Sequence, residues 1–315
     1  MARRAGWWSA IALTGLAIAG CGSSNSGPPT VRVALDFTPN AAHAPIFAAA
    51  LYPPPRSPVK IEIRQPGSST DSLKLLTTGR ADLAVLDIHD LGLARERGQD
   101  LVGVGVLVNR PLAAVIGGPG VRRPRELEGK RVGVTGLPSD DAVLRAVVEG
   151  DGGNYARVRR ITIGFTAVPS LVARKVAAAT AFWNVEGVAL RARGVHTHEF
   201  RLDARGSRYP ELVFVTTRAM LRAHREKIHD ALAVLDDSYG PALDEPGRIL
   251  RAIAKAGQID PVLLRAEYKA IRPALLTGVR FSATALRHWA AFDVRYGILR
   301  RPPDLRRAFD TSLWP

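Results

Sequence analysis

The order of apolar and amphipathic runs constrains the fold of this chain most strongly. After residue 30, short β-branched and apolar runs typical of strands alternate with longer runs typical of helices. We expect strands over 31–35, 59–64, 82–86, 101–108, 113–116, 131–134, 160–164, 177–182 and 212–216. Such alternation predicts an α/β fold in which parallel sheets carry helices on both faces.

The alternation forms two series, separated by Gly117-Gly118-Pro119-Gly120, a sequence typical of a loop or hinge. From residue 217 the chain is predicted to be mostly helical. We therefore predict two lobes. The first comprises residues 31–116 together with the helical tail 218–315, and the second comprises residues 117–217.

The first thirty residues are expected to lie outside the fold. Two arginines precede the apolar run Trp7–Ala19, which is too short to span a bilayer comfortably. Ile18-Ala19-Gly20-Cys21 resembles the lipobox of bacterial lipoproteins, where the cysteine is acylated and becomes the new N-terminus, and Cys21 is the only cysteine here. We predict a lipoprotein signal over 1–21, a flexible tether over 22–30, and anchoring at the extracytoplasmic face of the cell membrane. The alternative is an ordinary secretory signal with an incidental cysteine.

Composition excludes several classes of function. The net charge is +15, but the basic residues are spread among acidic ones and form no compact block with interleaved aromatics, so nucleic acid is not predicted as a partner. A single cysteine excludes a disulfide framework and a cysteine-based metal cluster. The sequence contains no nucleophile elbow, phosphate loop, zinc motif or dinucleotide fingerprint. We expect no enzyme activity, cofactor or metal.

One turn gathers the richest set of polar side chains. Asp36, Phe37, Asn40 and His43 lie between the strand predicted over 31–35 and a helix that begins near Pro45. Ligands of open α/β sheets bind beyond the carboxyl ends of strands, so these four are candidate ligand contacts. Each also has a structural alternative. The aspartate and asparagine can cap the turn, the phenylalanine can pack in the core, and the histidine can be structural.

Two further turns follow predicted strands. Trp183 and Glu186 come after the strand over 177–182, where the ring can wedge strand against helix and the acid can favour a helix N-terminus. Asp87 and His89 come after the strand over 82–86. A ligand-facing loop is favoured there over a metal site, because no further histidine or cysteine is nearby.

Two other segments are expected to have structural roles. Thr135–Asp140 opens a helix, where capping is favoured over anion binding. His196-Thr197-His198 is expected in a solvated loop rather than at a metal.

Four sequence blocks give the chain a family resemblance. They are Leu35-Asp36-Phe37-Thr38-Pro39-Asn40 with His43, Gly79-Arg80-Ala81-Asp82-Leu83-Ala84-Val85, Gly129-Lys130-Arg131-Val132-Gly133-Val134, and Ala181-Phe182-Trp183-Asn184-Val185-Glu186-Gly187. Together they resemble the type II periplasmic binding proteins that bind pyrimidine precursors of thiamine for ABC importers, whose yeast relatives synthesise that pyrimidine. The chain departs from the family pattern at Phe37, where tryptophan is frequent, at Ala177-Ala178, and at Asp87-Ile88-His89.

The resemblance implies a two-lobed protein that closes around its ligand by a hinge. Together with the lipobox, it leads us to predict a monomeric, lipid-anchored solute-binding protein that delivers a small polar heterocycle, such as a thiamine pyrimidine precursor, to the membrane subunits of an ABC importer. Phe37 and Trp183 would supply aromatic faces, and Asp36 and Glu186 would accept hydrogen bonds from an amino-bearing ring.

Two alternatives remain. One is a pyrimidine-synthase-like enzyme, a type that relies on a cysteine-rich iron motif and a reactive lysine, whereas this chain has no cysteine after Cys21 and no lysine in the Asp36–His43 turn. The other is a surface lipoprotein that senses a ligand without a transporter.

Overall fold

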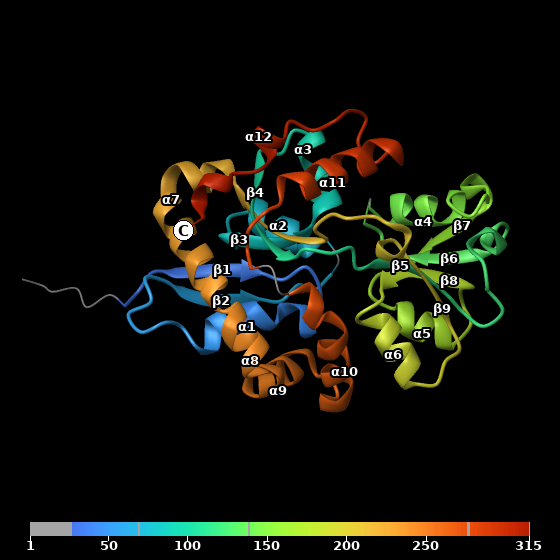
Figure 1. The fold of residues 1–315 in the computed structure, drawn as a ribbon, viewed down its shortest axis with the longest axis horizontal. Helices are drawn as coiled ribbons and strands as arrows, with labels where there is room; N and C mark the ends of the chain where they lie inside the picture. Colours follow the sequence, from blue (N-terminus) through green and yellow to red (C-terminus); the bar gives the residue numbers. More distant parts are fainter. Residues whose placement is uncertain (1–26, 69, 138, 276–277, 315) are drawn as a thin grey trace, which may run out of the picture.

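The computed structural model describes residues 27–68, 70–137, 139–275 and 278–314. Two five-stranded sheets, each flanked by helices, form two lobes that lie side by side along the long axis of the molecule (Figure 1). The first sheet has the order β2-β1-β3-β10-β4 and the second the order β7-β6-β8-β5-β9. The α/β, two-lobed fold expected from the sequence is confirmed.

The strands of the first sheet are β1 (Thr30–Ala34), β2 (Lys60–Arg64), β3 (Leu83–Asp87), β4 (Leu101–Val108) and β10 (Leu212–Thr217). Those of the second are β5 (Ala113–Gly117), β6 (Arg131–Val134), β7 (Arg159–Thr162), β8 (Ala178–Phe182) and β9 (His198–Arg201).

Both sheets are mixed, which corrects the expectation of purely parallel sheets. β1 runs parallel to β2 and β3, and β6 runs parallel to β7 and β8. In contrast, β10 is antiparallel to β3 and β4, and β5 is antiparallel to β8 and β9. β5 and β10 are the strands that the chain enters directly after crossing from one lobe to the other. Each therefore runs through its sheet in the direction opposite to that of its neighbours.

The crossings lie elsewhere than the lobe boundaries expected from the sequence. The chain crosses over residues 109–112, between β4 and β5, and returns over 202–211, between β9 and β10. β5 therefore belongs to the second sheet and β10 to the first. The glycine-rich break at 117–120 is a turn within the second lobe, where the Val121 N–H donates to the Gly118 carbonyl, and not the connection between lobes.

Helices cover the sheets in three groups. Those between strands of the first lobe are η1 (Ala41–His43), α1 (Ala44–Leu51), α2 (Asp71–Thr77) and α3 (Ile88–Glu96). Those of the second lobe are α4 (Ser139–Glu149), α5 (Ala167–Val172) and α6 (Glu186–Ala192). The tail forms α7 (Arg218–Asp237), α8 (Tyr239–Asp244), α9 (Pro246–Gly257), α10 (Pro261–Ile271), α11 (Ala283–Arg295) and α12 (Leu305–Ala308), and it packs mainly on the first lobe, as expected.

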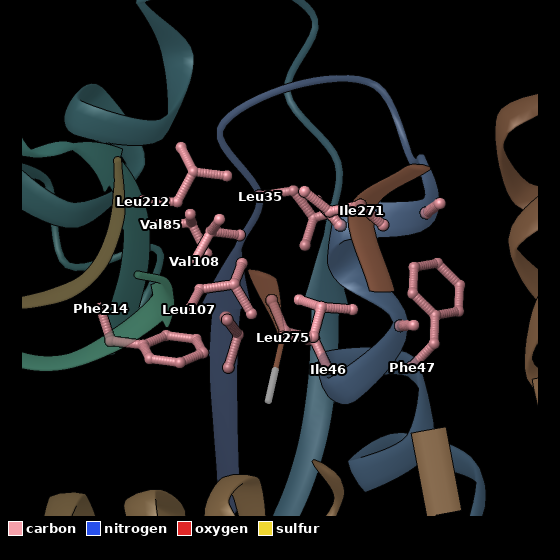
Figure 2. Packing of buried hydrophobic residues seen from close by; sticks show 14 of the residues in the cluster. Leu35, Ile46, Phe47, Val85, Leu107, Val108, Leu212, Phe214, Ile271 and Leu275 are labelled. Carbon is pink, nitrogen blue, oxygen red and sulfur yellow. The ribbon is translucent and has the colours of Figure 1, made fainter. Parts of the chain in front are cut away.

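Both faces of the first sheet are buried, which explains why its inner strands read as continuous apolar runs. Along β3, Leu83 and Val85 belong to one apolar cluster, whereas Ala84 and Leu86 belong to the cluster on the other face. Figure 2 shows the first cluster, in which side chains of α1, β3, β4, β10 and the end of α10 meet. This rigid layer fixes the strand ends from which the candidate site is built.

The sequence did not predict the strand β9. β9 begins at His198, which was expected in a solvated loop. Its sequence His-Glu-Phe-Arg is polar, because it is an edge strand whose residues are only half buried or exposed.

The predictions for the N-terminus, including acylation of Cys21, lie outside the described residues. None of the described helices is long and apolar enough to cross a membrane.

Candidate ligand-binding site

A cavity of about 320 Å³ lies between the two lobes. The first lobe contributes residues at or just beyond the carboxyl ends of β1 and β3, among them Asp36 and Asp87. The second lobe contributes residues at or just beyond the carboxyl ends of β6 and β8, among them Thr135 and Phe182. The cavity thus occupies the place at which ligands of open α/β sheets bind. Asp36 and Glu186, from the two turns emphasised by the sequence, both line it.

The first turn holds Asp36 at the cavity through a relay of hydrogen bonds. The backbone N–H of Asn40 donates to Nδ1 of His43 at 3.2 Å, so Nδ1 is unprotonated and the neutral ring carries its proton on Nε2. Nε2 in turn donates to Oδ1 of Asp36 at 2.9 Å. His43 is completely buried and the Asn40 side chain caps η1 by accepting from the Ala42 N–H, and neither lines the cavity. These two residues position the carboxylate.

An aromatic pair spans the lobes at the cavity. Phe37 of the first lobe meets Phe165, which lies between β7 and α5 of the second lobe, with ring centroids 4.2 Å apart and an interplanar angle of 65°. Edge-to-face pairs of this kind contribute roughly 1 kcal/mol beyond the burial of their surface. Phe165 was missed at the sequence level, although it follows the carboxyl end of a predicted strand.

Glu186 is the buried acid of the second lobe. It is the first residue of α6, its Oε2 accepts from the Phe182 N–H at 3.1 Å, and 8% of the residue is exposed. Burial raises the pKa of this carboxyl to about 7, although the backbone hydrogen bonds act in the opposite direction. Near neutral pH the group can therefore accept or donate a hydrogen bond.

Trp183 lies outside the cavity, at the crossing between the lobes. Its Nε1 donates to the Pro111 carbonyl at 3.1 Å, and its backbone N–H donates to the Leu112 carbonyl. The Arg201 guanidinium stacks over its ring at 3.7 Å from the centroid. The structure therefore gives this side chain a hinge contact instead of the ligand face expected from the sequence.

The two candidate residues at the end of β3, Asp87 and His89, likewise lie in different places. Asp87 lines the cavity and caps α3 by accepting from the His89 N–H at 2.8 Å. His89 is completely buried behind it, and its Nδ1 hydrogen bonds Asp293 of α11. Burial alone would lower the pKa of His89, but Asp293 and Asp87 outweigh it and raise the pKa to about 10. Burial also raises the pKa of Asp87 well above its ordinary value.

Glu211, which the sequence analysis missed, connects this turn to the hinge. Its Oε2 accepts from the N–H groups of Leu112 and Ala113, at 2.6 and 3.3 Å, in the first crossing segment. The Ile88 N–H donates to the Glu211 carbonyl at 2.9 Å. Glu211 therefore joins the turn at the end of β3 to the first crossing segment between the lobes.

The segment Thr135–Asp140, which was expected to cap a helix, is held by hydrogen bonds to its own aspartate. Asp140 accepts from the Thr135 hydroxyl and the N–H groups of Gly136 and Leu137, and from the Thr180 hydroxyl. These donors are therefore occupied within the protein, which agrees with capping rather than anion binding.

The cavity as a whole is acidic. Its lining includes five carboxyl groups and one guanidinium, and these residues are Asp36, Asp87, Asp90, Asp140, Glu186 and Arg97. Burial raises the pKa of Asp90 well above its ordinary value, and the like charges of Asp87 and Asp140 raise it further. Such a lining favours ligands that donate N–H bonds or carry positive charge, and it disfavours oxyanions.

Comparison with known families agrees with the geometry. The NMT1/THI5-like family model matches residues 56–249. The chain belongs to this family. A curated relative, the formylaminopyrimidine-binding protein of Halalkalibacterium halodurans, is 29% identical over 211 residues, which cover 65% of this chain and 63% of the relative. The match thus spans less than two thirds of that relative's length.

Solved structures share the fold at low sequence identity. The ligand-binding component of an ABC-type import system from Staphylococcus aureus has a TM-score of 0.74 at 12% identity and covers 90% of this chain and 97% of its own. The alkanesulfonate-binding protein of Xanthomonas axonopodis pv. citri has a TM-score of 0.71 at 18% identity, with 92% and 99% covered. These likenesses establish the periplasmic-binding-protein fold of this chain.

Proposed function

We propose that this protein captures a small amino-bearing heterocycle between its lobes and delivers it to the membrane subunits of an ABC importer. The observation that carries the proposal is the acidic cavity between the lobes, with Asp36 and Glu186 contributed from opposite sides. An aminopyrimidine presents adjacent ring-nitrogen and amino groups on one edge, and buried carboxyl groups are strong partners for such groups.

The acceptor-rich lining also separates this chain from the sulfonate-binding structure that shares its fold. A sulfonate brings three anionic oxygens and needs N–H donors or cations, whereas Arg97 is the one cationic side chain among the described residues that line the cavity. Leaving a buried carboxylate unpaired costs on the order of 1–3 kcal/mol. A ligand without N–H donors would leave these carboxylates unpaired, so the site selects against it. The family membership and the formylaminopyrimidine-binding relative support a thiamine-type pyrimidine precursor as the ligand class.

Binding without catalysis accounts best for the site residues. Asp36, Asp87 and Glu186 are each held by a backbone or side-chain donor, and the described residues include no cysteine to act as a nucleophile. The two backbone crossings near Glu211 provide a hinge about which closure over a ligand can occur.

The proposed anchor is acylation of Cys21, which would keep the binding lobes at the outer face of the membrane beside the importer. Replacing Cys21 by Ser should move the protein from the membrane fraction to the soluble fraction. Unchanged membrane retention would contradict the anchor. A neighbouring gene for an importer membrane subunit would favour import over ligand sensing.

A thermal-shift screen tests the ligand class directly. We expect aminopyrimidines to raise the unfolding temperature of the protein, since a ligand at 100 times its Kd adds about 2.7 kcal/mol of stability. Alkanesulfonates, nitriles and amino acids serve as the comparison set. The Glu186→Ala variant, which lacks the buried acceptor, should lose most of the shift. A shift produced by sulfonates and not by aminopyrimidines would refute the proposed ligand class.

A further inference from the structure

A second concave site lies in the second lobe, away from the ligand cavity. It is a depression of about 590 Å³ beside the amino ends of β6, β7 and β8, whereas the carboxyl ends of β6 and β8 line the ligand cavity. Five cationic side chains line the depression, and they are Lys130, Arg131, Arg159, Arg174 and Lys175. No acidic residue is among the described residues that line it.

The sheet itself brings two of these charges together. Arg131 and Arg159 are direct partners in the parallel pairing of β6 with β7, so they occupy neighbouring positions on one face. Like charges directly opposite on adjacent strands are destabilising. The Arg159 N–H also donates to the Lys130 carbonyl, which places a third cationic residue at the same strand ends.

The other two cations come from the segment between α5 and β8. Arg174 has a φ of 54°, in the left-handed region that favours glycine, and its N–H donates to the Leu171 carbonyl. Lys175 follows it directly and donates its N–H to the Ser170 carbonyl. This tight turn presents two consecutive cationic side chains to the depression.

Intramolecular charge pairing does not account for the cluster. Many arginines elsewhere in the described chain form ion pairs, as Arg160 does with Asp141 and Arg123 with Asp151. Lys130 helps to lower the pKa of the Glu126 carboxyl. That carboxylate, however, lies outside the depression lining and accepts a hydrogen bond from the Arg122 backbone N–H.

We propose that this depression, the basic basin, binds a phosphate-type oxyanion. Guanidinium groups match the geometry of phosphate oxygens and can donate two parallel hydrogen bonds, and several cations around one concavity can together neutralise a multivalent anion. The anion is the phosphate group of either a soluble phosphate ester or an anionic lipid headgroup. Because all five side chains are exposed, binding should weaken strongly as salt is added.

The test uses the full chain carrying Cys21→Ser, so that acylation does not itself hold the protein on lipid. Inorganic pyrophosphate is titrated by calorimetry, and sedimentation is measured with vesicles of phosphatidylglycerol and phosphatidylcholine, with pure phosphatidylcholine as blank. We expect Arg131→Gln/Arg159→Gln to weaken binding about tenfold or more, since it removes two phosphate partners. Arg174→Gly, which suits the left-handed backbone and so preserves the fold, should weaken it about threefold.

The matched control is Arg265→Gln/Arg301→Gln, which removes the same charge from exposed positions outside the basin. It should change affinity by less than about twofold, since it removes no phosphate partner. Binding of pyrophosphate without binding of vesicles would support a soluble phosphate compound as the source, and binding of vesicles would support a headgroup. The proposal is overturned if neither probe binds, or if the control weakens binding as much as the basin variant. Affinity for the cleft ligand should be unchanged in all these variants, so this test is independent of the proposed import function.

Discussion

Trp183 and Glu186 are three residues apart in one turn, yet they face different parts of the molecule. The tryptophan is fully partnered within the protein, through the Pro111 carbonyl and the Arg201 guanidinium. The glutamate lines the cavity and has backbone N–H donors but no cationic partner among the causes of its raised pKa. His89, whose ring centroid lies 4.9 Å from that of Tyr209 in the second crossing, and the cavity-lining Asp87 repeat the division in the first lobe. We call the first kind hinge-facing and the second kind cavity-facing.

The difference teaches how a strand-end turn can serve two purposes. Hinge-facing side chains are held by neighbours distant in sequence, so they stabilise the fold. Cavity-facing carboxyls are buried at a cost that protein contacts only partly offset, and a ligand with N–H groups can complete their hydrogen bonding. Replacing the first kind should therefore reduce stability, and replacing the second should reduce affinity.

The largest expected effect is on stability at the hinge. Trp183→Ala should lower the free energy of unfolding by about 3–5 kcal/mol, because it removes a buried ring and leaves a cavity. Trp183→Phe keeps a ring under Arg201 but loses the bond to Pro111, and it should cost only about 1 kcal/mol. Urea unfolding monitored by circular dichroism measures both. A stable alanine variant with strongly reduced ligand affinity would show that Trp183 belongs to the binding site.

Unfolding of the wild type and of Glu186→Gln, measured over a range of pH, tests the cavity-facing carboxyl of Glu186. Because the folded-state pKa is raised from 4.5 to about 7, the ionised carboxylate is disfavoured by folding, and the stability of the wild type should fall as pH rises across that window. The variant lacks this dependence. The free energy of unfolding of the variant, relative to that of the wild type, should therefore rise by about 3 kcal/mol between pH 4 and pH 8, as a pKa raised from 4.5 to about 7 implies.

The control for this series is Glu149→Gln, which removes a half-exposed carboxylate paired with Arg145. It should shift stability by less than about 1 kcal/mol at any pH in the range. Equal pH profiles for the wild type and Glu186→Gln would mean that the Glu186 carboxyl is not buried in the ligand-free protein.

The smallest effect concerns the aromatic pair between the lobes. Phe165→Ala removes the edge-to-face contact with Phe37, and we expect ligand affinity to fall by a few-fold, equivalent to about 1 kcal/mol. Phe200→Ala, which removes a ring from β9 of the same lobe outside the cavity lining, is a control for general loosening of the lobe. An equal loss of affinity in both variants would argue against a specific role for the pair.

The fold was largely predictable because most of its strands are buried on one or both faces and so have strong apolar patterns. The edge strands β7 and β9 lack such a pattern: β7 is exposed throughout, and β9, which was missed, is polar and at most half buried. Strand direction was not predictable, since it depends on where the chain crosses between the lobes. That in turn depends on partners such as Glu211 with Leu112, which are 99 residues apart.

The cavity-facing carboxyls were predictable because Asp36, Asp87 and Glu186 each follow the carboxyl end of a strand. Which neighbours in these turns face the hinge was not predictable. His89 is directed by Asp293, 204 residues away, and Trp183 by Pro111, 72 residues away. Phe165 was missed because its partner Phe37 belongs to the other lobe.

Titration calorimetry with an aminopyrimidine tests the division between cavity-facing and hinge-facing residues most directly. The wild type is compared with Asp36→Ala, Glu186→Ala and, as the hinge-facing counterpart, Trp183→Phe. We predict that each carboxyl variant binds at least about tenfold more weakly, a loss of about 1.4 kcal/mol or more, while Trp183→Phe stays within about threefold of the wild type. Wild-type affinity in both carboxyl variants would contradict a ligand site between the lobes.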